Sequence, residues 1–420
     1  MLYRIFVSLL IIITIISISI TGFLFYLLYA ENTLPAAETV SDMQNHTDTE
    51  SDSADSFNTE QDTGDIKNSF GESKNGEDKV NINTENTPVK ETLKIVAVGD
   101  INLGRGVKAW VEKQEKRYIY PFEEVVDILK RNDVIFGNLE EPITASTKGL
   151  AGIDEGGKYV LKNDPEAING IIYAGFNLLS LANNHILDYY EKGLLDTMEI
   201  LDRNNIAYAG AGKNLEEARN PAVLEKKGQK IGMLAYTDMA EVVYKGDPPL
   251  MFLAGEETCG VAPTRKEYIL EDIKKYRNSF DILIVSMHWG VEYSYEPTES
   301  QVALAHEIID RGADIIIGHH THRCQGVEIY KGKPIFYSLG NFLFDQNNPL
   351  NQESFIFEME MEDKKLTALS GIPFKVINKS RIVPAKGAEA KEMLEREKIL
   401  SEKLNSVCRI EDDKIIFDIE

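Results

Sequence analysis

The chain has 420 residues, enough for two or three domains, and a formal net charge of −23. Binding to a nucleic-acid backbone needs clustered lysine and arginine, so this acidic composition argues against a nucleic-acid partner. The three cysteines lie far apart and form no Cys-x-x-Cys pair, which argues against a disulfide framework or a cysteine zinc site.

Near the start of the chain, an uncharged apolar segment extends from Ile5 to Ala30. A membrane-spanning helix needs ~20 apolar residues, whereas a signal peptide has an apolar core of only ~7–15 residues and a small-residue cleavage site. The sequence "LLYAEN" is a poor cleavage site, so residues 1–30 are predicted to be an uncleaved membrane anchor. Arg4 precedes the span and acidic residues follow it. The positive-inside rule then predicts a single-pass cell-membrane protein with a cytoplasmic N-terminus and the bulk of the chain extracytoplasmic.

Residues 31–91 are polar and acidic, with 15 acidic residues and 4 lysines, so that 4 − 15 = −11. Such a composition buries too little apolar surface to offset the entropy lost on ordering, and it predicts a disordered linker. Because like charges repel along the segment, the linker should be extended and should carry the folded part away from the membrane.

After the linker, near-continuous apolar strands alternate with amphipathic helices. This pattern predicts an α/β fold with helices on the sheet faces. The predicted strands are 93–100, 133–140, 176–185, 230–238, 281–290, 313–322 and 333–345, and the helices are 120–132, 164–175, 190–205, 265–278 and 298–312. These elements define a main domain over 92–345. Residues 346–420 should complete it with two antiparallel edge strands (354–362 and 364–378), a helix (390–406) and a last strand (413–420).

Several predicted strands end in polar side chains. They are Asp100, Asn138, Glu140, Asn184, His185, His288, His319, His320 and His322, which include five of the seven histidines. Ligands of open α/β sheets bind beyond the carboxyl ends of the strands. A single histidine there is more often structural, but several strands that deliver such groups to one edge indicate a site. Oxygen and imidazole ligands suit one or two divalent ions, such as Mn, Fe, Zn or Mg.

The segment Gly318–His322, "GHHTH", contains three of these histidines. In an extended segment alternate residues share a face, so His320 and His322 should both point into the site. His319 should point away and support them, since ligating groups need orienting partners. Gly318 is expected to let the backbone turn.

Longer sequence blocks strengthen this interpretation: "VGDINLGRGV", "NLEEPIT", "LANNHILDY", "HWGVEY" and "GHHTHRCQGVEIYKGKPIFYSLGNFLFD". In this order, between Leu93 and Asp345, they resemble the CapA family of bacterial poly-γ-glutamate capsule synthesis proteins, within the calcineurin-like metallophosphoesterases. The resemblance implies a four-layer αββα sandwich. It also implies a role in making or exporting poly-γ-glutamate, beside membrane subunits of the polymer synthase.

The resemblance further implies site roles by position. His185 takes the place of the general acid in a two-metal mechanism, with Glu140 as the bridging ligand. The other implied metal ligands are Asp100, Asn184, His288, His320 and His322. The chain departs from the phosphoesterase pattern at Asn102, where an imidazole ligand is expected. It also departs at Glu140 and Asn138, where aspartates are expected, so a single-metal or metal-free site stays open.

Other residues beside these positions are candidates for supporting or substrate-binding roles. Arg105 could hold an anion, since arginine matches phosphate or carboxylate with two hydrogen bonds, or it could form a salt bridge within the protein. Asp188 and Glu292 are candidates for orienting the ligands. Three functions follow: a membrane-anchored component of capsule biosynthesis, a metal-dependent phosphoesterase acting on an extracellular phosphoester, or a non-catalytic scaffold that binds the anionic polymer.

Overall fold

The computed structural model describes residues 91–150, 160–244 and 250–419. They lie in one compact unit, Asn83–Glu420. The predicted anchor, and all of the predicted linker except Glu91, lie outside the described residues. Within the described part, no helix is both long and apolar enough to cross a membrane.

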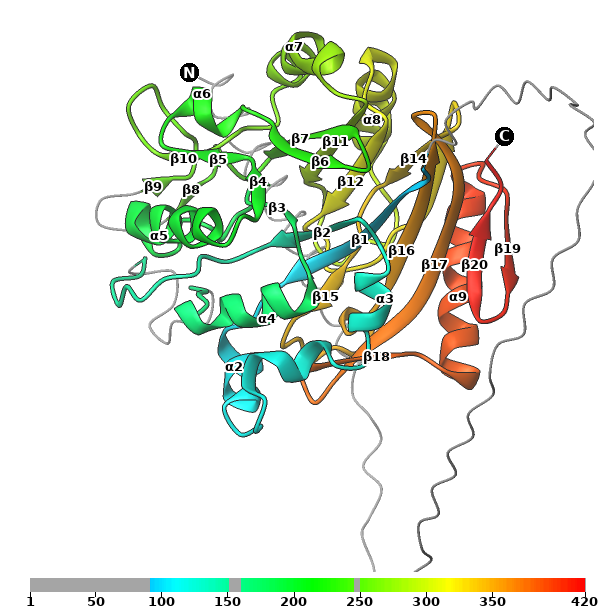
Figure 1. Ribbon diagram of the computed structural model, residues 1–420, viewed down its shortest axis with the longest axis horizontal. Helices are drawn as coiled ribbons and strands as arrows, with labels where there is room; N and C mark the ends of the chain where they lie inside the picture. Colours follow the sequence, from blue (N-terminus) through cyan, green and yellow to red (C-terminus); the bar gives the residue numbers. More distant parts are fainter. Residues whose placement is uncertain (1–90, 151–159, 245–249, 420) are drawn as a thin grey trace, which may run out of the picture. The chain divides into compact units, whose positions relative to one another are not determined.

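The described strands form two large sheets (Figure 1). The ten-stranded sheet has the order β19-β20-β17-β16-β1-β2-β3-β4, with β15 beside β1 and β18 beside β17. Its strands are β1 Leu93–Ile101, β2 Val134–Leu139, β3 Leu178–Ser180, β4 Ala207–Ala209, β15 Asn341–Leu343, β16 Glu353–Glu362, β17 Lys365–Ile377, β18 Arg381–Pro384, β19 Cys408–Glu411 and β20 Lys414–Phe417. Strands β1 to β4 are parallel to one another, and β16 to β20 pair in antiparallel fashion.

The six-stranded sheet has the order β13-β14-β12-β11-β7-β6. Its strands are β6 Ala222–Lys226, β7 Gln229–Thr237, β11 Ile282–His288, β12 Ile315–His319, β13 Val327–Tyr330 and β14 Lys333–Phe336. Two short pairs complete the strands, β5 Ala211–Gly212 with β10 Gly260–Val261, and β8 Val243–Tyr244 with β9 Leu250–Met251.

Helices cover the outer face of each sheet. Helices α2 Arg105–Val111, α3 Val126–Lys130, α4 Ile168–Ala174 and α5 Tyr190–Arg203 pack on the ten-stranded sheet, and α7 Lys266–Tyr276 and α8 Glu299–Arg311 on the six-stranded sheet. The remaining helices are α6 Leu215–Ala218 and α9 Gly387–Lys403, and the 3-10 helices are Arg117–Phe122, Pro165–Ala167, Arg277–Ser279 and Pro349–Asn351. Helix α9 runs beside β20 in Figure 1 and contributes Ala390 and Met393 to the core between the sheets.

The continuous apolar strands arise because successive side chains enter different cores. In β1, Ile95 and Ala97 join the cluster between the two sheets, while Val96 and Val98 join the cluster under the outer helices. Strand β11 divides in the same way between the inner core and the core under α7 and α8. Since both faces of these strands are buried, neither face needs polar side chains.

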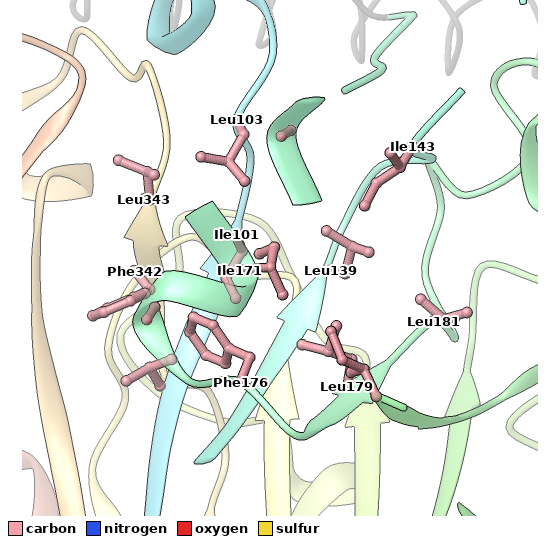
Figure 2. Close-up of a cluster of buried hydrophobic side chains, with 14 of the residues drawn as sticks. Ile101, Leu103, Leu139, Ile143, Ile171, Phe176, Leu179, Leu181, Phe342 and Leu343 are labelled. Atoms are coloured by element: carbon pink, nitrogen blue, oxygen red, sulfur yellow. The ribbon is translucent and has the colours of Figure 1, made fainter. Parts of the chain in front are cut away.

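The outer cluster under α4 also fixes two strand ends. Figure 2 shows Ile171 of α4 and Phe176 packed near Ile101 and Leu139, which end β1 and β2. Ile101 directly follows Asp100, and Leu139 directly precedes Glu140. Packing of these apolar neighbours therefore holds two carboxylates at the edge of the sheet.

The mixed α/β prediction is confirmed, but several details of it were wrong. Strands β16 and β17 are interior rather than edge strands, because β16 pairs with both β1 and β17, and β17 also pairs with β18 and β20. The predicted strand over 333–345 is two strands, β14 and β15, that enter different sheets. The predicted strand over 176–185 is reduced to Leu178–Ser180.

Candidate metal centre

Strand ends from both sheets meet at one place. Asp100 is the next-to-last residue of β1 and lies against His319, which ends β12 of the other sheet, with 3.2 Å between Asp100 Oδ1 and His319 Nδ1. Asn138 of β2 donates to Asp100 Oδ1 at 2.9 Å, and its Nδ2 lies 3.5 Å from Nδ1 of His288 at the end of β11. The site is thus built across the seam between two sheets, rather than along the edge of one.

Asp100, Glu140 and His322 form a group that could hold a metal ion, with one ligand atom from each lying within 4.8 Å of the others. All three side chains are buried. Asp100 Oδ2 and both carboxylate oxygens of Glu140 have no hydrogen-bond partner among the described residues. Buried polar atoms are normally satisfied, so these three oxygens indicate a missing positive partner.

The pKa shifts of Asp100 and Glu140 also indicate a site for a cation. Burial, followed by the negative charge of Asp100, raises the pKa of Glu140 well above its usual value. Burial also opposes ionisation of Asp100, but the hydrogen bond and charge of His319 outweigh it and lower the Asp100 pKa. A divalent cation between the two would offset both the burial and the mutual repulsion, so these residues fit such a group.

A second set of candidate ligands lies beside the first. His288 Nε2 is 2.9 Å from Asn184 Oδ1, and the His288 and His320 rings are 4.8 Å apart. Burial is the main cause that lowers the pKa of His288 far below its ordinary value and that of His320 to about 4. Both imidazoles are therefore neutral near pH 7, which is the form that binds metals.

The backbone of "GHHTH" differs from the expected extended chain. Strand β12 ends at His319, and His320 and His322 have φ angles of +92° and +55°. The alternation argument is therefore wrong, because His320 and His322 lie in bends with positive φ after the end of β12 and not in an extended segment. His319 is buried against Phe136, with ring centroids 5.5 Å apart, and its Nδ1 contacts the carboxylate of Asp100.

Gly318 was also given the wrong role. It lies within β12, and a Cβ built on it would be 1.9 Å from the carbonyl oxygen of Tyr337. The glycine is needed for this close approach of the chain after β14, and not for a turn. Gly99 has the same relation to the carbonyl oxygen of Gly340, so two glycines let the β15 region pack against the strand ends.

His185 lies beside the candidate ligands and is oriented by a carboxylate. Its Nδ1 is 2.8 Å from Asp188 Oδ2, which also accepts the backbone N–H of Leu161 at 2.7 Å. Burial raises the pKa of Asp188, while the neighbouring His185 lowers it. This arrangement fixes the ring and leaves Nε2 of His185 for a reacting group.

The loop after β1 is held by side chains whose role was not foreseen. Glu141 accepts the N–H groups of Leu103 at 3.1 Å and Gly104 at 2.9 Å, and burial raises its pKa to about 8. Asn102 accepts the N–H of Gly104 at 2.9 Å, so its oxygen orients this loop. In the sequence, Glu141 is marked only by its position directly after Glu140, in "NLEEP".

Three more residues support the site. Arg105 forms an ion pair with Asp345. Asn341 Oδ1 lies 2.9 Å from His322 Nδ1 and accepts a hydrogen bond from it when that nitrogen carries the proton. Asn183, which was missed, donates to Leu139 O and accepts the N–H of His185, so it links the ends of β2 and β3.

Glu292 is exposed on the loop that follows β11. The neighbouring Tyr293 donates its N–H to Thr321 O at 2.7 Å, and its ring lies 6.0 Å from that of His322. The loop is therefore attached to the "GHHTH" turn, at the rim of the site and outside the group of buried ligands.

Residues 94–346 match the protein family described as bacterial capsule synthesis protein PGA_cap. The capsule biosynthesis protein CapA of Bacillus anthracis is 33% identical over 302 residues, which cover 69% of this chain and 70% of that protein. The PGA biosynthesis protein CapA of Bacillus subtilis (strain 168) is 32% identical over 331 residues, with coverage of 79% and 83%.

Weaker similarity, which specifies no function, extends to solved structures. A hypothetical protein from Thermus thermophilus is 16% identical with a TM-score of 0.40, and covers 68% of this chain and 100% of its own. The 5'-nucleotidase from Candida albicans is 10% identical with a TM-score of 0.37, and the match covers 75% of this chain and 59% of that one.

Proposed function

Because the chain belongs to the PGA_cap family of bacterial capsule synthesis proteins, we propose that it acts in poly-γ-glutamate capsule biosynthesis through a metal-dependent hydrolytic site of the metallophosphoesterase type. One observation carries the catalytic part. Three buried carboxylate oxygens of Asp100 and Glu140 lack hydrogen-bond partners among the described residues, beside neutral imidazoles and a carboxylate-oriented His185.

In this proposal Asp100, Glu140 and His322 hold one divalent cation, and Asn184, His288 and His320 offer a second position beside it. When bound, such cations polarise the scissile group and lower the pKa of an attacking water molecule. Mn, Fe, Zn and Mg all accept this mixture of oxygen and imidazole ligands.

The chain's own residues supply orientation and proton transfer. Asp188 holds Nδ1 of His185, so Nε2 is the atom that would donate a proton to the leaving oxygen of a phosphoester. Asn138 links Asp100 to His288 across the two sheets and keeps the two ligand sets in register. His319 contacts Asp100 from the core side and favours its ionised form.

The proposal also places this domain outside the cell, at the membrane. The apolar, uncharged segment Ile5–Ala30 and the acidic residues 31–91 support an anchor followed by an extended tether. Poly-γ-glutamate synthase subunits in the same membrane would then be its partners.

Complementation of a capsule-forming bacterium deleted for this gene tests the function. Wild-type protein should restore surface poly-γ-glutamate, whereas His185→Ala should not. His306→Ala is the matched control, because His306 lies on α8 and pairs with Glu328, away from the ligands. Full restoration by His185→Ala at equal protein level would contradict a hydrolytic role.

A further inference from the structure

Asn102 is a buried polar residue beside the candidate ligands, and only one end of its carboxamide has a partner. The side chain is completely buried and directly follows Ile101, the last residue of β1. Burial of a carboxamide is costly unless both its oxygen and its nitrogen form hydrogen bonds. The oxygen accepts one hydrogen bond, whereas Nδ2 has no partner among the described residues.

The hydrogen bond to the oxygen fixes the orientation of the carboxamide. Asn102 Oδ1 accepts the N–H of Gly104 at 2.9 Å. If the amide were turned over, its NH₂ group would face this N–H, and two donors would oppose each other. The backbone N–H of Asn102 also donates to Leu343 O at 2.7 Å, so the residue is held from two sides. Nδ2 is therefore the end of the side chain that is left for another group.

The residues on either side of Asn102 show which face of the chain carries its side chain. Ile101 and Leu103 both belong to the cluster under the outer helices, and Figure 2 shows their side chains there. In an extended segment, the residue between two such neighbours points to the opposite face. Asn102 is therefore directed to the space between the sheets, where Asp100 contacts His319.

Glu140 is the neighbour of Asn102 at the end of the adjacent strand. Ile101 pairs with Leu139 in the register of β1 and β2, and Glu140 donates its N–H to Ile101 O at 3.2 Å. No hydrogen bond joins the two side chains, since both carboxylate oxygens of Glu140 and Nδ2 of Asn102 lack partners in the described part of the chain. Neighbouring strand ends thus carry unpartnered acceptors and an unpartnered donor.

These unpartnered atoms need partners of opposite kinds. The carboxylate oxygens are acceptors, and a cation can satisfy them. The NH₂ group of Asn102 only donates, so no cation can satisfy it, and its partner must be an acceptor. A divalent cation at the centre would attract anions, and hydrogen bonds to charged acceptors are stronger than those to neutral ones. A cation and this donor together therefore complement an anionic oxygen.

The same geometry gives a physical meaning to the departure from the phosphoesterase pattern at position 102. An imidazole nitrogen in this place would bind a cation through a lone pair. The amide nitrogen of Asn102 has no lone pair available to a metal, and its oxygen is directed to the Gly104 N–H. Asparagine here thus supplies a hydrogen-bond donor in place of a metal ligand.

We propose that Asn102 binds substrate and not metal, by donating a hydrogen bond from Nδ2 to an anionic oxygen of a phosphoester at the candidate metal centre. A donor that is already oriented stabilises negative charge that develops on such an oxygen during displacement. The proposal rests on the function proposed above and names an oxyanion as the group that this residue recognises in the same site.

The test measures binding of inorganic phosphate to the purified full-length protein by titration calorimetry, after loading with Mn²⁺ or Zn²⁺, together with the metal content of the same samples. The variants are Asn102→Ser and Asn102→Thr. Their hydroxyl groups can still accept the Gly104 N–H, but both variants lack the amide nitrogen.

Asn177→Ser is the matched control. Asn177 also accepts a backbone N–H, that of Ile135 at 2.9 Å, but its Nδ2 donates to Asp133 O at 2.9 Å. Asp133 directly precedes β2, whereas the candidate site lies at the other end of that strand. The control therefore removes an amide of similar local role at a distance from the site.

Both Asn102 variants should keep the metal content of the wild type and bind phosphate at least about tenfold more weakly, because each loses a hydrogen bond to a charged group. The control should change phosphate affinity by less than about twofold. Thermal denaturation identifies the folded variants, and Thr fills more of the buried space if Ser destabilises the protein.

Unchanged phosphate affinity in a folded Asn102 variant would overturn the proposal, because a buried water would then serve Nδ2. Loss of metal in parallel with phosphate binding would also overturn it, because Asn102 would then hold the metal. A wild-type protein that retains metal but binds no phosphate would contradict the proposal as well.

Phosphoester turnover, measured on the same preparations, separates this proposal from the proposed function. If the wild type holds metal and turns over phosphoester but Asn102→Ser binds phosphate equally well, the role of Asn102 is refuted and the proposed function stands. If the wild type binds metal and phosphate without any turnover, and Asn102→Ser weakens phosphate binding at equal metal content, the hydrolytic function is refuted and Asn102 stands as an anion donor.

Discussion

Asp188 Oδ2 lies 2.8 Å from Nδ1 of His185, and Asp188 is almost completely buried while His185 reaches solvent. The backbone N–H of Leu161 donates a hydrogen bond to the same carboxylate oxygen and helps to hold it in place. Asp188 therefore determines the orientation of His185 from a position only one short turn further along the chain.

Replacement of Asp188 by asparagine should lower kcat for a generic phosphoester by about 10- to 100-fold, because the imidazole loses its orienting charge while its Nε2 stays in place. Metal content should not change, since Asp188 is not among the candidate ligands. Asp196→Asn on α5, which breaks only a pair with Lys192 and a bond from Thr144, is the control. Unchanged turnover in Asp188→Asn, or loss of metal in parallel with turnover, would contradict this role.

Glu140→Gln should have opposite effects on stability with and without metal. In chelator-treated protein the change removes a buried carboxyl next to Asp100 and should raise the free energy of unfolding by about 1–3 kcal/mol. In the wild type, metal at 100 times its Kd should stabilise the fold by about 2.7 kcal/mol, and the variant should lose most of that gain.

Thermal denaturation of both proteins, with chelator and with added Mn²⁺ or Zn²⁺, measures these effects. A Glu140→Gln protein that keeps the full metal-dependent rise in Tm would show that Glu140 holds no metal. A chelated variant less stable than the chelated wild type would contradict the electrostatic account.

Glu397 on α9 predicts a pH dependence of stability that is independent of catalysis. Burial raises the pKa of this carboxyl to about 8, above the value of about 4.5 for an exposed glutamate. Between these pH values the folded state binds more protons than the unfolded state, so the contribution of Glu397 to stability falls as pH rises from about 4.5 to 8.

Glu397→Gln should remove that slope and be the more stable protein at pH 8.5, by an amount on the order of a few kcal/mol, which urea unfolding between pH 5 and 8.5 would measure. The hydrogen bond from Ser401 can be kept by the glutamine oxygen. Parallel stability–pH curves for the two proteins would refute a buried, proton-binding Glu397.

Sequence patterns predicted the α/β class because its physical causes are local. Continuous apolar runs such as Ile95–Gly99 reflect strands buried on both faces, and the spacing in α8 reflects one buried helical face. Which strands share a sheet depends on contacts between distant segments. Nothing local in 333–345 indicates that β14 and β15 separate into different sheets, or that β16 lies next to β1.

The candidate site, too, could be predicted from local sequence only in part. The side chains that end strands β1, β2, β11 and β12 could be identified because polar groups interrupt apolar runs. The turn through His320 and His322 could not, because positive φ angles at non-glycine residues depend on the surrounding structure rather than on local preference. Glu141 and Asn183 were missed because each lies next to a more conspicuous residue.

The claim of a metal-dependent site is tested most directly by elemental analysis of the purified full-length protein and of the double variant His320→Ala/His322→Ala. The structure predicts at least one equivalent of a divalent metal per chain in the wild type after loading with Mn, Fe, Zn or Mg, and its loss in the folded double variant. A wild-type protein that retains no metal under any of these loading conditions would contradict the claim.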